Sequence, residues 1–157
     1  MIIMGIDPGS ARIGYGIIKT NGGLELISCG IIEIKEQGVG NQIAQAAKRI
    51  SEIIKKYQPD LAGIEKIYFS KNVKTGIAVA QTRGAIILEI SKYRIPIKEF
   101  SPSEIKLATA NYGLADKKAV AKMVAKILNI EKLTGFDDAS DALAVAITTA
   151  NVKNWGD

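Results

Sequence analysis

Residues 1–18, MIIMGIDPGSARIGYGII, contain two apolar runs separated by a polar turn, and this stretch decides the fold. The first run ends in Asp7, which is followed at once by a Pro-Gly pair of the kind that favours a turn. An aspartate at the end of a buried strand is costly unless another group pairs with it. Asp7 therefore either caps the turn or binds a cation. Together with a third run, the pattern predicts an antiparallel meander of strands at residues 1–6, 13–18 and 24–34.

The rest of the chain alternates between helical and strand patterns. Ser101 and Glu104 form a capping-box pattern with Pro102 at the first helical position, so a short helix should begin there. Apolar periodicity predicts longer helices at 41–57, 72–92, 115–128 and 137–150, and strands at 61–65 and 95–100. This order indicates an α/β fold with a mixed five-stranded sheet flanked by helices on both faces. We expect a single domain over residues 1–157, with 152–157 as a flexible tail.

The composition narrows the possible chemistry and location. The chain has 157 residues, a formal net charge of +5 and no histidine, which excludes every mechanism that uses imidazole as a base or a metal ligand. Its one cysteine, Cys29, excludes an internal disulfide and a cysteine-based zinc site. The positive charge favours a polyanionic partner. No apolar stretch reaches the roughly 18 residues that span a bilayer, so we expect a cytoplasmic protein with no membrane partner.

Four carboxylates stand at positions where apolar neighbours make a charge costly: Asp7, Glu65, Asp138 and Asp141. Asp7 and Glu65 each end a strand pattern, so they share one edge of the sheet if the two strands are parallel neighbours. Asp138 and Asp141 are three residues apart and face the same way on a helix. Carboxylates without histidine or cysteine are the oxygen donors that Mg²⁺ or Mn²⁺ prefers. Two such ions about 4 Å apart can activate water and stabilise the leaving oxygen in phosphodiester hydrolysis.

Each acid also has a structural explanation. Asp137, just before the last helix pattern, fits an N-cap, and Asp138 fits a favourable interaction with the helix dipole. Glu65 can pair with Lys66, and Asp7 can cap its turn. The sequence pattern alone leaves these alternatives open.

Four segments, taken together, resemble the RuvC-type Holliday junction resolvases of the RNase H-like superfamily in their order and approximate spacing. They read GIDPGSARIGYGII, GIEKIYFSKNVKTGIAVAQTRGAI, FSPSEIKLATANYGLADKKAVAKMV and DDASDALAVAI. The resemblance implies a metal-dependent endonuclease of DNA recombination and repair. It also implies a homodimer that makes paired nicks across a four-way DNA junction, leaves 5′-phosphate and 3′-hydroxyl ends, and works with the RuvA and RuvB branch-migration proteins.

The resemblance also assigns roles to residues. Asp7 and Glu65 match the first two catalytic carboxylates, and Asp138 and Asp141 match the acidic pair of the last helix. These four are the implied ligands of two Mg²⁺ ions, for which Mn²⁺ substitutes. Asp137 falls outside the motif.

The same comparison implies DNA contacts. Lys106 and Lys117 match basic residues near the scissile phosphate, and Lys118 can share their role. Tyr68, or its neighbour Phe69, matches an aromatic residue that stacks on a base at the junction centre. Without the resemblance, solvated helix faces would be the simpler explanation of the three lysines.

Other classes of function are compatible with parts of the pattern. A protein that binds branched DNA without cleaving it would share the basic charge, and another RNase H-like nuclease would share the carboxylates. An actin-like ATPase also begins with a strand that ends in Asp and Gly, but this chain is too short for two nucleotide-enclosing lobes. The apolar helix at 72–92 could serve either as a dimer interface or as a buried core helix.

Overall fold

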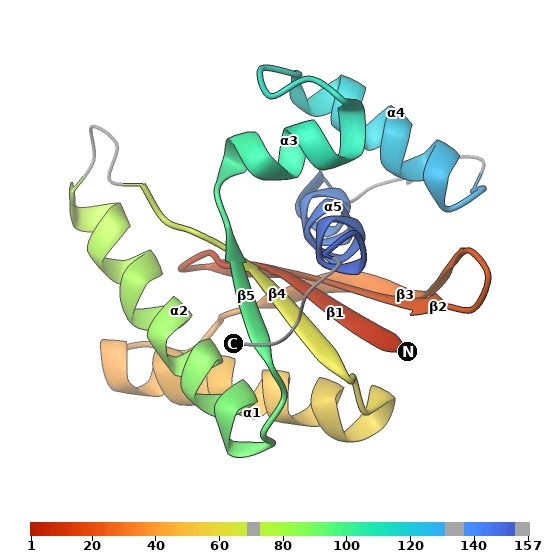
Figure 1. Ribbon diagram of the computed structural model, residues 1–157. Helices are drawn as coiled ribbons and strands as arrows, with labels where there is room; N and C mark the ends of the chain where they lie inside the picture. The colour runs from red at the N-terminus through yellow and green to blue at the C-terminus, as the bar shows by residue number, and fades with distance from the viewer. Residues whose placement is uncertain (69–72, 131–136, 153–157) are drawn as a thin grey trace.

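The computed structural model describes residues 1–68, 73–130 and 137–152, without the side chains of Val73, Asp137 and Asp138. Five strands form one sheet in the order β3-β2-β1-β4-β5 (Figure 1). The strands are β1 (Ile2–Asp7), β2 (Arg12–Thr20), β3 (Leu24–Glu33), β4 (Leu61–Glu65) and β5 (Ile97–Phe100). The helices are α1 (Val39–Tyr57), α2 (Val73–Lys92), α3 (Pro102–Ala110), α4 (Lys117–Ile127) and α5 (Asp137–Ala150).

The sheet combines an antiparallel half with a parallel half. β1, β2 and β3 form the predicted meander, while β4 lies beside β1 and β5 beside β4, both parallel. Strands β1 and β4 therefore end at the same edge of the sheet, which is the arrangement expected for Asp7 and Glu65. The predicted mixed five-stranded α/β fold is confirmed. The part of the predicted tail beyond Val152 lies outside the described residues.

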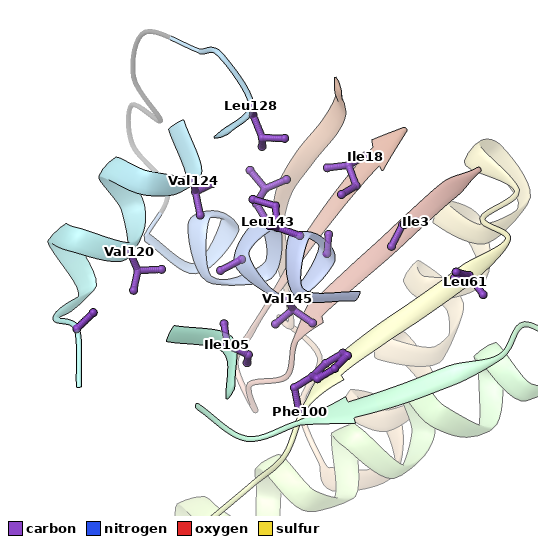
Figure 2. Packing of buried hydrophobic residues seen from close by; sticks show 14 residues of the cluster. Ile3, Ile18, Leu61, Phe100, Ile105, Val120, Val124, Leu128, Leu143 and Val145 are labelled. Carbon is purple, nitrogen blue, oxygen red and sulfur yellow. The ribbon is translucent and has the colours of Figure 1, made fainter. Parts of the chain in front are cut away.

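Helices cover both faces of the sheet. Figure 1 shows α1 and α2 on one face and α5 on the other, with α3 and α4 packed outside α5. Side chains alternate along β1, so Met4 and Ile6 point to the α1/α2 face and Ile3 to the α5 face. Figure 2 shows the α5-side core, in which Leu143 and Val145 lie between the sheet and the outer helices. None of the helices in the described ranges is long and apolar enough to cross a membrane.

A row of three glycines lets α5 lie close to the sheet. Gly5 of β1 is paired with Gly16 of β2 on one side and with Gly63 of β4 on the other. A Cβ added at Gly5 would lie 2.2 Å from the carbonyl oxygen of Ala142 in α5. One added at Gly63 would lie 1.9 Å from Thr149 Oγ1. The helix therefore occupies the space that side chains would fill at these positions.

Several local predictions can be checked directly. The capping box at the start of α3 is present: the Ser101 hydroxyl accepts a hydrogen bond from the Glu104 amide, and the Glu104 carboxylate accepts one from the Ser101 amide. Cys29 packs against the α5-side core, and burial raises the pKa of its thiol, which suits a packed side chain better than a nucleophile.

Candidate active site

Three of the predicted acids line one cleft. Ile6 of β1 pairs with Ile64 of β4, so the next residues, Asp7 and Glu65, are neighbours at the strand ends. Alternation along both strands places their side chains on the face that α5 covers. Asp141 lies on the first turns of α5 and faces the same space. The three carboxylates line a cleft of about 330 Å³ at the carboxyl-terminal edge of the two strands.

The negative charge in this cleft is only partly balanced. Burial raises the pKa of the Glu65 carboxyl above its ordinary value of 4.5, because removal from water disfavours the charged form. A hydrogen bond with Asp7 lowers this pKa, the charge of Asp141 raises it, and Lys117 and Lys106 lower it. The net direction is upward. Glu65 thus has Asp7 as its hydrogen-bond partner in the cleft, and a bound cation would relieve the repulsion among the acids.

Two lysines bring positive charge to the same space. Lys117, the first residue of α4, donates a hydrogen bond from Nζ to Asp141 Oδ2 at 2.8 Å. Lys106 of α3 is half-buried and also lines the cleft. Lys118 lies outside this cleft and instead lines an adjoining depression of about 260 Å³ between α4 and α5, which Lys117 and Asp141 also line. The cleft therefore offers acids to a cation and two lysines to an anion.

The cleft has an apolar wall. Ile105, Val120 and Ala144, from α3, α4 and α5, form that wall beside the charged groups. The apolar wall lowers the local dielectric constant and so strengthens the charge interactions next to it.

The donor chemistry fits a divalent cation that prefers oxygen. The three acids of the cleft supply only carboxylate oxygens, the ligand type of Mg²⁺ and Mn²⁺. As they stand, no three His, Cys, Asp or Glu side chains within the described ranges are close enough to enclose an ion. Lys117 holds Asp141, while Asp7 and Glu65 share a hydrogen bond. Cation binding would replace these contacts, so the acids fit the ion in chemistry and need a small rearrangement in geometry.

The remaining predicted residues lie apart from the cleft or outside the described part of the chain. Tyr68 follows β4 by three residues and is 63% exposed, so it is accessible to a partner. Phe69 lies outside the described residues. Asp137 and Asp138 are the first two residues of α5, but their side chains are not among those described.

One residue that contacts the site from the α1/α2 face of the sheet was not predicted from the sequence. Arg83 of α2 donates a hydrogen bond from Nε to the main-chain oxygen of Glu65 at 3.0 Å. Its Nη2 pairs with the Glu99 carboxylate on β5, and only 16% of the Arg83 side chain is exposed. The available signal was a single arginine within a largely apolar helix, but its partners are distant in sequence.

Neutralising Glu65 should stabilise the protein when no metal is present. In EDTA, we expect Glu65→Gln to raise Tm by about 2–4 °C, the shift that corresponds to ~1 kcal/mol in a chain of this size. The glutamine amide can donate a hydrogen bond to Asp7, while the buried negative charge is removed. Mg²⁺ should raise the Tm of the wild type and leave the variant nearly unchanged. Differential scanning calorimetry at several Mg²⁺ concentrations measures both effects.

The pH dependence has a defined sign. Because the pKa of Glu65 is raised in the folded state, its charged form lowers the free energy of unfolding. This destabilisation is full above the folded-state pKa and disappears below the unfolded-state pKa near 4.5. The gain in Tm should therefore shrink as the pH falls towards 4.5. Glu33→Gln is the control, because Glu33 is exposed and pairs with Lys35 at 3.0 Å, which lowers its pKa. A rise in Tm for Glu33→Gln, or none for Glu65→Gln, would contradict this account.

Comparison with known proteins gives a consistent result. The family model described as crossover junction endodeoxyribonuclease RuvC matches residues 3–149. A crossover junction endodeoxyribonuclease RuvC from Prochlorococcus marinus is 44% identical over 155 residues, covering 98% of this chain and 100% of that protein. Another from Petrotoga mobilis is 40% identical over 155 residues, covering 98% and 95%.

Solved structures agree in fold. Thermus thermophilus RuvC in complex with a Holliday junction substrate superposes with a TM-score of 0.89 at 25% identity, covering 96% of this chain and 93% of that one. The yeast mitochondrial Holliday junction resolvase gives a TM-score of 0.69 at 12% identity, covering 93% and 77%, which shows the shared fold alone.

Proposed function

Because this chain belongs to the RuvC family of crossover junction endodeoxyribonucleases, we propose that it resolves Holliday junctions by hydrolysis in the cleft between β1, β4 and α5. The observation that carries this assignment is the meeting of Asp7, Glu65 and Asp141 beside Lys106 and Lys117. Paired nicks in the two opposed strands would leave 5′-phosphate and 3′-hydroxyl ends. The proposed place of action is the cytoplasm.

We assign the acids of the cleft to cation binding. Asp7, Glu65 and Asp141 would hold Mg²⁺, with Mn²⁺ as a substitute, and Asp138 would complete the set for a second ion. When bound, the ions supply an activated water and charge stabilisation for the leaving oxygen. The residues themselves fix the place of attack, because both strand ends and α5 converge there.

The lysines would hold the phosphate. Lys106 and Lys117 line the same cleft as the acids, so they can neutralise the scissile phosphate and the charge that develops on it. Lys117 would exchange its contact with Asp141 for the phosphate when a cation occupies the acids. Lys118, in the adjoining depression, would contact a neighbouring phosphate of the same strand.

We propose a homodimer, which an exposed apolar stripe on α2 supports. Ile77 and Leu88 are 51% and 61% exposed, and they lie eleven residues apart on one side of the helix. Gly84 lies between them with open space around it, so a second helix can approach closely. A two-fold dimer through this stripe would present two identical clefts to the two-fold symmetric junction. Docking with RuvA and RuvB stays a prediction from the family resemblance.

Tyr68 should contribute to junction turnover. We expect Tyr68→Ala to keep duplex binding and to lower junction turnover about tenfold, because stacking on an unpaired base is worth ~1–3 kcal/mol. Single-turnover nicking and gel-shift titrations measure the two properties. Tyr93→Ala is the control, since Tyr93 is a partly exposed tyrosine just after the opposite end of α2. Equal turnover in the two variants would remove Tyr68 from the DNA contact.

Cleavage of a synthetic four-way junction, with each strand end-labelled in turn, tests the proposed function. The wild type should make paired symmetric nicks in Mg²⁺ and none in EDTA. Asp141→Asn should bind the junction without nicking it. Tight binding with no nicks in Mg²⁺ or Mn²⁺ would instead identify a non-cleaving branched-DNA-binding protein, and nicks unrelated to the junction would identify another RNase H-like nuclease.

A further inference from the structure

The peptide group that follows Glu65 is fixed at both of its polar atoms. The Lys66 amide donates to the Phe100 carbonyl of β5 at 2.8 Å. The Glu65 carbonyl accepts from Arg83 Nε at 3.0 Å. The Lys66 contact continues the β4–β5 pairing by one residue, while the Arg83 contact is made by a side chain of α2. Arg83 thereby restrains the rotation about the Cα–C bond of Glu65 at the point where the strand ends.

Arg83 is itself anchored. Glu99 on β5 accepts a hydrogen bond from Arg83 Nη2. The planar guanidinium therefore uses two of its donors to connect α2 with β4 and β5. In the sheet, Glu99 is in register with Ile64, which points to the α1/α2 face. Arg83 consequently reaches the strand end from the face opposite the cleft. Because the side chain is only 16% exposed, water competes weakly for these two contacts.

The contact between Arg83 and Glu65 lies at a point of the chain between the cleft and α2. Glu65 carries a side chain of the catalytic cleft, and the residues directly after it lead to Tyr68 and then to α2. Arg83 belongs to that same helix, whose exposed stripe is the proposed dimer interface. The contact between Arg83 and Glu65 therefore links the end of β4 directly to α2, the helix of the proposed dimer interface.

We propose that Arg83 is a positioning residue that holds the Glu65 carboxylate in place for cation binding. The inference rests on the proposed function, since it takes Glu65 as a cation ligand. Without Arg83, the Glu65 carbonyl loses its donor, the strand end can rotate, and the carboxylate spreads over several orientations. Groups that orient a metal ligand typically change metal affinity or activity by about 10–100-fold when removed.

Arg83→Met tests this role because it keeps the aliphatic stem and removes every donor. We expect the Mn²⁺ concentration at half-maximal nicking to rise about tenfold, and the Mn²⁺ concentration at half-maximal Tm shift, measured without DNA, to rise with it. Junction affinity in EDTA should stay within twofold of the wild type. Arg83→Lys should raise the Mn²⁺ requirement less than Arg83→Met does. Its ammonium can reach the Glu65 carbonyl but cannot donate to Glu65 and Glu99 with the geometry of a guanidinium. Glu99→Gln should give a smaller increase, of about two- to threefold, since its amide oxygen still accepts from Nη2.

Arg49→Gln is the matched control. Arg49 also pairs with a glutamate, Glu52 at 2.8 Å, but both residues lie on α1 and neither contacts a strand end of the cleft. Its Mn²⁺ dependence should equal that of the wild type. All measurements are made well below the lowest Tm in the series. If Arg83→Met is too unstable to purify, Arg83→Lys and Glu99→Gln carry the comparison.

The outcomes separate the two proposals. A lower Tm with an unchanged Mn²⁺ dependence would make Arg83 a structural residue only and overturn the positioning role, while the nuclease assignment stands. A loss of junction affinity with an unchanged Mn²⁺ dependence would make it a DNA contact and overturn the role as well. A wild type with neither nicking nor an Mn²⁺-dependent Tm would overturn the nuclease assignment, and the positioning role with it.

Discussion

Asp7→Asn should lower the rate of junction nicking by at least about a thousandfold, equivalent to roughly 4 kcal/mol of transition-state stabilisation. Asp7 ends β1 beside Glu65 and lines the cleft that α5 covers, so the substitution removes a proposed cation ligand and its negative charge. Asparagine has nearly the same shape and fits the same space. Junction binding should be equal or tighter, because one negative charge beside the phosphate is lost. Single-turnover nicking and gel-shift titrations in Mg²⁺ give the two numbers.

Asp60→Asn is the control for that experiment. Asp60 precedes β4 at the opposite edge of the sheet, where its Oδ2 accepts a hydrogen bond from the Ile2 amide of β1 at 2.7 Å. The same charge is removed next to the same two strands, yet far from the cleft. Nicking by Asp60→Asn should match the wild type. A loss of junction binding in Asp7→Asn, with normal binding in Asp60→Asn, would show that Asp7 acts in folding and caps its turn.

Local patterns in the sequence were sufficient for the elements of the fold. The Pro-Gly turn after Asp7, the capping box at Ser101 and the helical period of residues 41–57 each depend on neighbours within a few positions. The structure has β1, α3 and α1 where these patterns predict them. The parallel pairing of β1 and β4 was less certain from sequence, because it joins segments that are more than fifty residues apart.

The site was predictable as a set of residue types and not as a geometry. That Asp7, Glu65 and Asp141 meet requires α5 to lie directly over β1 and β4, a contact that no local pattern encodes. Arg83 was missed for a related reason, since its partners, a main-chain carbonyl and a glutamate on another strand, become neighbours only in the folded chain. From the sequence alone, an arginine that is largely covered in the fold cannot be told from an exposed helix residue.

Gly5→Ala should lower the free energy of unfolding by at least about 3 kcal/mol, the upper part of the range for overpacked cores. Its Cβ would lie 2.2 Å from the Ala142 oxygen and 2.4 Å from the Ala146 nitrogen, both atoms of the α5 backbone. A side chain could rotate away, but a helix backbone must move as a unit. In a chain of this size the expected fall in Tm is roughly 6–12 °C.

This displacement should also reach the chemistry. Asp141 precedes Ala142 on α5, so a helix pushed off the sheet carries the third carboxylate away from Asp7 and Glu65. Nicking by folded Gly5→Ala, measured well below its Tm, should therefore fall together with its stability. Gly23→Ala is the control, because a Cβ there meets nothing within 4 Å. Wild-type stability and wild-type nicking in Gly5→Ala would contradict this account. The close packing of α5 on the glycine row would then not be what brings the three acids together.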